Sequence, residues 1–174
     1  MTIYLHILKW VFSPEILGVE SMLKIIVSVL GRVLLSSIFL LAGLNKILNW
    51  EASVQVLTQA LAQVRDHLSV PLLEYIVQTM QQHVVLSLVM GTVCELLGGA
   101  LVFLGLFVRF GAFLLVLFLV PTTVIFHPFW GLVSPERDMQ VVMFVKNAAI
   151  LGGVLIVWAF GSGFQKFSTS LKQG

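Results

Sequence analysis

Charged side chains inside long apolar stretches are the residues of this sequence that could do chemistry. Glu95 lies twelve residues after His83 and fourteen before Arg109, near the middle of one such stretch. Arg32 and Lys146 interrupt two others. A charged side chain at the centre of a membrane helix costs about 2.5–3.5 kcal/mol on insertion scales. Such residues therefore predict either a buried ion pair or a ligand site.

The neighbours of Glu95 indicate which way its side chain points. Residues i−4, i+3 and i+4 share one face of a helix. At these positions around the carboxylate stand Gly91, Gly98 and Gly99. Glycine lets the backbone of a partner helix approach closely. We therefore expect Glu95 to point into a helical bundle and not toward lipid.

Helical spacing places other polar residues on shared faces. In the first apolar stretch a stripe runs at spacings of 4, 3, 4 and 3 through Arg32, Ser36, Phe39, Gly43 and Lys46. Lys146 shares a face with Gly153, with Asn147 beside it, and His127 shares a face with Thr123. The convergence of a carboxylate, cations and an imidazole on inward faces predicts a ligand site. Its members would be Arg32, Lys46, Glu95, His127, Lys146 and Asn147.

Each of these residues also has a purely structural explanation. Glu95 with Arg32 or Lys146 could form a buried ion pair that fixes helix register and has no other role. Lys46 lies near a predicted helix end, where cationic side chains commonly snorkel to the headgroups. His127 precedes aromatic residues and fits an interfacial belt better than a metal site, because no second His or Cys stands at ligand spacing. No metal site is predicted.

The composition places these residues in a membrane. Of the 174 residues, 59% are hydrophobic and 10% are charged, against about 25% charged in an ordinary soluble domain. The mean hydropathy is +1.04. A formal net charge of +2 without a basic run argues against a nucleic-acid partner. The single cysteine, Cys94, excludes a disulfide within the chain.

Four apolar stretches are long enough to cross the ~30 Å hydrocarbon core, which takes about 20 mostly apolar residues. They cover residues 22–48, 84–108, 110–126 and 139–160. The second and third are joined by a very short link at Arg109, and a single helix through both would be about 63 Å long. They therefore form an antiparallel hairpin. The predicted fold is an all-α polytopic membrane protein with a four-transmembrane-helix bundle.

The remaining segments predict the surroundings of this bundle. The first loop, 51–82, mixes apolar residues with Gln, Asp, His and Arg, so we expect one or two interfacial helices there. Residues 1–20 are interpreted as an interfacial segment, because their apolar part is too short to span and is followed by Pro14. The transmembrane domain would cover 21–165, and 166–174 would form a cytoplasmic tail. With four spans, six Lys and Arg residues lie on the side of the membrane that holds both termini, and four lie on the other side. Because the side richer in Lys and Arg faces the cytoplasm, we expect both termini to be cytoplasmic.

Four motifs follow one another along the chain. The first consists of Arg32 and the run 39–46, and the second of Glu95, Gly98-Gly99, Gly105 and Arg109. The third is Phe126-His127, and the fourth consists of the run 143–147 and Gly152-Gly153. Together they cover about residues 25–161 and resemble the DoxX family of small bacterial four-helix membrane proteins. The N-terminal extension of about twenty residues and the long first loop depart from the family's pattern. The resemblance implies a location in the bacterial inner (plasma) membrane.

The resemblance also implies a function. Some members of the family are named as subunits of terminal quinol oxidases or thiosulfate:quinone oxidoreductases. The first hypothesis is therefore a quinone-associated accessory subunit of a membrane redox complex. In it Glu95 and His127 would exchange protons, while Arg32, Lys146 and Asn147 would hold carbonyl oxygens or balance charge. The sequence has no self-contained catalytic motif, no His pair suited to haem and no Cys set for iron–sulfur, so a partner protein would supply the electrons.

Two other classes of function stay open. The second hypothesis is a non-enzymatic scaffold or assembly chaperone, in which the buried charges only lock the bundle. The third is a small proton-coupled transporter, since a membrane carboxylate can couple proton and substrate movement. A Glu already neutralised by a cation is poorly suited to bind a cationic drug, so this class ranks last. The expected partners are the lipid bilayer, a quinone, and a protein partner or a second copy of the chain.

Overall fold

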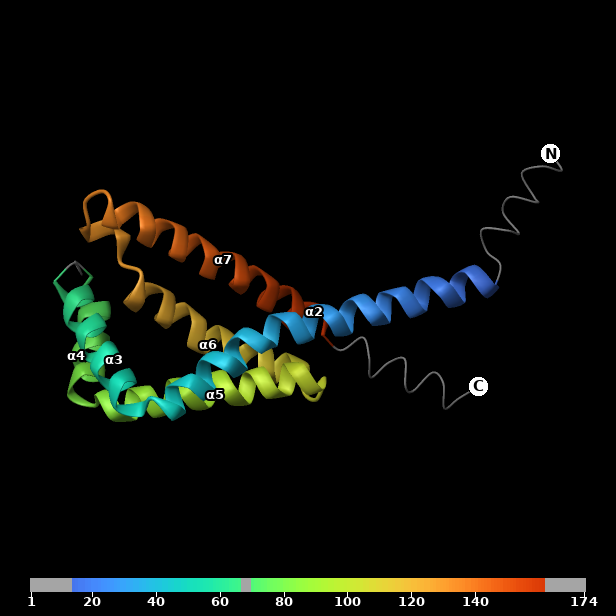
Figure 1. Ribbon diagram of the computed structural model, residues 1–174, viewed down its shortest axis with the longest axis horizontal. Coiled ribbons are helices and arrows are strands. Elements are labelled where there is room, and N and C mark those ends of the chain that lie inside the picture. Colours follow the sequence, from blue (N-terminus) through green and yellow to red (C-terminus); the bar gives the residue numbers. More distant parts are fainter. Residues whose placement is uncertain (1–13, 67–69, 162–174) are drawn as a thin grey trace.

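The computed structural model describes residues 14–66 and 70–161 (Figure 1). Over these residues the chain is helical and contains no strand, which confirms the predicted all-α class. The elements in order are α2 (Pro14–Leu48), α3 (Trp50–Arg65), α4 (Pro71–Gln82), α5 (Val84–Leu104), α6 (Val108–Phe126), the short 3-10 helix η1 (Phe129–Gly131) and α7 (Glu136–Phe160).

Four segments of the described chain are long and apolar enough to cross a membrane: Met22–Leu48, Val84–Leu104, Val108–Gly131 and Glu136–Phe160. The predicted four-span, multi-pass architecture is therefore confirmed, and the first span has the predicted limits. The second ends four residues before the predicted limit of 108, because Gly105 adopts the left-handed conformation at φ 74° and ends α5.

The helix α2 begins at Pro14, eight residues before its apolar span. Proline suits the first turn of a helix, where its missing N–H would have no partner. Residues 14–20, which we expected in an interfacial segment, are thus helical and continuous with the first span. The rest of that segment and the expected tail 166–174 lie outside the described residues.

The first loop folds into the two helices α3 and α4, as expected for 51–82. They pack together and against the adjoining ends of α5 and α6, and Figure 1 shows them crossing one end of the bundle. The buried side chains of this end are Leu57, Leu61, Val64, Val77, Leu88 and Ile125. A second core at the centre of the bundle joins α2, α5, α6 and α7 through Phe39, Val102, Val108, Ala112, Leu115, Leu119 and Val154.

Two facing glycines set the crossing of α5 and α6. A Cβ atom added to Gly98 would lie 2.8 Å from the backbone oxygen of Gly111, and one added to Gly111 would lie 3.0 Å from that of Gly98. Larger residues would hold the two backbones apart. From this crossing the helices diverge toward α3 and α4 (Figure 1).

We predict that Gly98→Ala lowers the stability of the fold, because its methyl group meets a backbone oxygen that cannot move aside. Overpacking of this kind costs about 1–3 kcal/mol. Gly152→Ala in α7 is the matched control, since nothing lies within 4 Å of the added Cβ. Thermal unfolding in detergent measures both variants. Equal melting temperatures for the two would contradict the proposed helix contact.

Candidate functional site

The buried carboxylate of Glu95 makes an ion pair with Lys46. The distance from Lys46 Nζ to Glu95 Oε2 is 2.7 Å, and the bond joins α2 to α5. The side chain of Glu95 is 2% exposed and that of Lys46 is 25% exposed. The inward orientation predicted for Glu95 is therefore observed.

Close packing of α2 on α5 allows this pair to form. A Cβ atom added to Gly43 would lie 2.5 Å from the side chain of Leu96 and 3.4 Å from Glu95 Oε2. Lys46 follows Gly43 by three residues and thus shares its helix face. The absence of a side chain at position 43 brings the backbone of α2 near α5, so the lysine reaches the carboxylate.

An aromatic ring also faces the ammonium group of Lys46. Its Nζ atom lies 5.3 Å from the centre of the Phe118 ring on α6, within the range of a cation–π interaction. That ring in turn packs edge to face on Phe39 of α2, with ring centres 6.4 Å apart. The ammonium group is therefore held between a carboxylate of α5 and a ring of α6.

The prediction that Glu95 would pair with Arg32 or Lys146 is wrong. Arg32 precedes Lys46 by fourteen residues, which is about 21 Å along a helix. Its guanidinium lies instead beside Gly105, where an added Cβ would be 2.8 Å from Nη1. Lys46, which was predicted either to belong to the ligand site or to snorkel to the headgroups, is the partner of Glu95.

Three other predicted site residues lie away from this pair. Lys146 is exposed on α7, and its Nζ contacts the sulfur of Met143 at 3.2 Å. Asn147 beside it is half-buried. His127 Nδ1 lies 2.8 Å from Gln140 Oε1, a contact that ties the end of α6 to α7. The predicted convergence of six residues is thus reduced to Lys46 and Glu95, because α7 packs mainly on α6 and little on α2.

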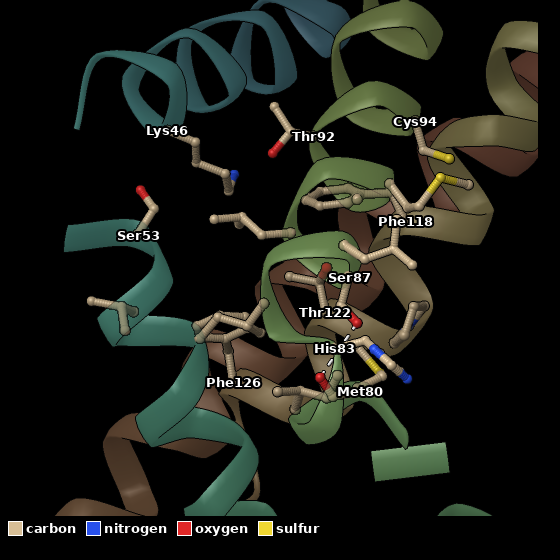
Figure 2. A pocket seen from close by; sticks show the side chains of 18 of the residues that line it. Lys46, Ser53, Met80, His83, Ser87, Thr92, Cys94, Phe118, Thr122 and Phe126 are labelled. Atoms are coloured by element: carbon tan, nitrogen blue, oxygen red, sulfur yellow. Dashed lines mark hydrogen bonds between the residues drawn. The ribbon is translucent and has the colours of Figure 1, made fainter. Parts of the chain in front are cut away.

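A cavity of about 910 Å³ lies where α5 and α6 diverge. Side chains from α2, α3, α4, α5 and α6 line it, and most of them are apolar. Its polar side chains include Lys46, Ser53, His83, Ser87, Thr92 and Thr122 (Figure 2). This volume lies within the range of about 300–1,000 Å³ that is usual for small-molecule sites.

Thr92 is a cavity residue that the sequence reasoning missed. It is 5% exposed, and its hydroxyl has no hydrogen-bond partner among the described residues. A buried polar group without a partner costs roughly 1–3 kcal/mol. Thr92 precedes Glu95 by three residues and shares its helix face, and this spacing was the signal that could have identified it.

The cavity presents hydrogen-bond donors in apolar surroundings. A lysine ammonium carries three N–H donors and no acceptor, and one of these donors is used by Glu95. The ion pair has no net charge. The site is therefore suited to an uncharged lipophilic molecule that carries an oxygen acceptor. No group of three or more His, Cys, Asp or Glu that could hold a metal occurs in the described part of the chain.

Fold and site together define a small multi-pass membrane protein in which three of the four spans, with α3 and α4, line a cavity beside a buried ion pair. The DoxX family model matches residues 27–128, which is more than half of the chain, and the chain belongs to that family. No curated protein and no solved structure matches it. The matched range contains Lys46, Glu95 and every residue that lines the cavity, whereas α7 lies outside it.

We predict that Lys46→Met destabilises the fold by about 3 kcal/mol, because it leaves a buried carboxylate without its cation. Adding Glu95→Met to this variant should restore most of the loss, since the two effects of a direct pair are not additive. Unfolding by SDS in mixed micelles gives the free energy of unfolding of the single and the double variant.

The matched control for this prediction is Lys146→Met, on the exposed face of α7. It should change stability by less than about 0.5 kcal/mol. Two results would show that the Lys46–Glu95 bond does not stabilise the fold. One is a double variant that is no more stable than Lys46→Met, and the other is a control that loses as much stability as Lys46→Met.

Proposed function

We propose that this DoxX-family protein binds a quinone in the cavity between α5 and α6 and serves as an accessory subunit of a membrane redox complex. The observation that carries the proposal is the cavity itself, with the ammonium group of Lys46 held in its wall by Glu95. A quinone combines an uncharged carbonyl-bearing head group with an apolar tail, which is the chemistry that such a cavity fits.

The exposed side of the cavity supports a ligand that comes from lipid. Leu86 and Met90 of α5 and Leu117 of α6 line the cavity and are also exposed on the membrane-spanning surface. A molecule dissolved in the hydrocarbon meets apolar side chains along this side. Its tail could stay in the lipid while its head group occupies the cavity.

The charge of the site supports an uncharged head group. Because Glu95 neutralises Lys46, a cation would find no free carboxylate there and an anion would meet no net positive charge. A carbonyl oxygen needs only a hydrogen-bond donor, which Lys46 provides. The neutral ion pair therefore favours a quinone over the cationic substrate of a proton-coupled exporter.

Electron transfer in this proposal depends on a partner protein. The sequence has one cysteine and no His pair suited to haem, so the chain would bind the quinone while another subunit oxidises or reduces it. We further propose an inner-membrane location with both termini cytoplasmic, which places α3 and α4 on the outer side.

We predict that quinone co-purifies with the protein extracted into native nanodiscs at a level above that of the bulk membrane. Mass spectrometry of the extracted lipids measures the amount of quinone per lipid in the nanodiscs and in the bulk membrane. The double variant Lys46→Met with Glu95→Met, which should regain most of the stability, removes the hydrogen-bond donor of Lys46 and should lose most of the enrichment.

Lys146→Met is the control for this experiment and should retain the quinone. Quinone at the bulk level in the parent protein would overturn the proposal. The non-enzymatic scaffold would then be the better account, and a stable protein partner recovered from both the parent and the double variant would support it.

A further inference from the structure

The hydroxyl of Thr92 is buried without a hydrogen-bond partner, unlike the hydroxyls of three other helical threonines in the described residues. Thr58, Thr79 and Thr123 each donate to the backbone oxygen four residues earlier, at 2.7 to 2.9 Å. Thr92 is buried in α5 and makes no such bond to Leu88, and no other polar atom of the described residues bonds its Oγ1. A buried hydroxyl in this state points to a group that the chain alone does not contain.

The direction of this side chain shows where that group would lie. Figure 2 shows Thr92 and Lys46 reaching the same part of the cavity, one from α5 and the other from α2. Glu95 bonds the lysine from the wall and is itself not among the lining residues. Two hydrogen-bonding groups from different helices therefore converge beside the apolar interior of the cavity.

We propose that Thr92 and Lys46 together bind one oxygen of the ligand head group, and that Thr92 is the residue that positions it. The inference rests on the proposed function and deepens it. Lysine can only donate to this oxygen, whereas a threonine hydroxyl can donate or accept. The pair can therefore bind the oxygen as the carbonyl of a quinone, with both residues donating. It can equally bind the hydroxyl of a quinol, with Lys46 donating and Thr92 accepting.

The experiment uses the full-length protein in nanodiscs free of endogenous quinone. A short-tailed ubiquinone and its quinol are titrated separately, and native mass spectrometry gives both dissociation constants. Thr92→Val replaces the hydroxyl by a methyl group of similar size. It should raise both constants about threefold to tenfold, as expected for the loss of one hydrogen bond. Thr92→Ser keeps the hydroxyl and should bind like the parent protein.

Two further measurements separate this role from a structural one. Thr92→Val should melt at the same temperature as the parent or higher, because it removes a buried polar group that has no partner. Thr58→Val alters a helical threonine that does not line the cavity and should leave both constants unchanged.

Equal binding by Thr92→Val and the parent, in a protein that does bind quinone, would overturn the role of Thr92 and leave the proposed function standing. If Thr92→Val raises the dissociation constant of only the quinone or only the quinol, the proposal that the hydroxyl both donates and accepts is contradicted. If the parent itself binds neither form, the proposed function fails and this inference fails with it.

Discussion

The carboxylate of Glu95 stands near the middle of a helix whose surroundings are hydrocarbon and other helices. A charge in that position must be compensated inside the protein, because water is not there to solvate it. The bond to Lys46 provides this compensation, and it also fixes the register of α2 on α5. The glycine at 43 is needed for the same contact, since a side chain there would separate the two helices.

The arrangement of the other helices follows from this contact and from the crossing of α5 and α6. Facing glycines hold those two helices together at Gly98 and Gly111, so they diverge at their other ends (Figure 1). The long first loop fills part of the resulting space with α3 and α4, and the part left open is the cavity. Lys46 links the two features, since it bonds Glu95 on one side and lines the cavity on the other. In our account the ion pair that stabilises the bundle is also the polar wall of the ligand site.

The sequence predicted the parts of this structure that depend on one helix at a time. Apolar length identified the four spans, and the glycines around Glu95 predicted its inward orientation, because both are properties of neighbouring residues. The partner of Glu95 depends on how far two helices are displaced along each other, which spacing within either helix does not contain. Lys46 lies two residues before the end of α2 and resembled a snorkelling lysine. Lys146 lies on a regular face of α7, but that face is exposed. Thr92 was marked only by its spacing from Glu95, and its missing hydrogen bond could not be predicted, since most helical hydroxyls are satisfied by their own backbone.

We propose that a lipophilic ligand binds in the cavity beside Lys46. Photo-crosslinking with an azido-quinone in nanodiscs, followed by peptide mass spectrometry, tests it most directly. The account predicts labels on residues of the cavity wall from three helices, Tyr75 of α4, Met90 of α5 and Phe118 of α6, and their loss in the presence of excess unlabelled quinone. Labels spread along the exposed face of α7, or labels that excess quinone does not reduce, would contradict it.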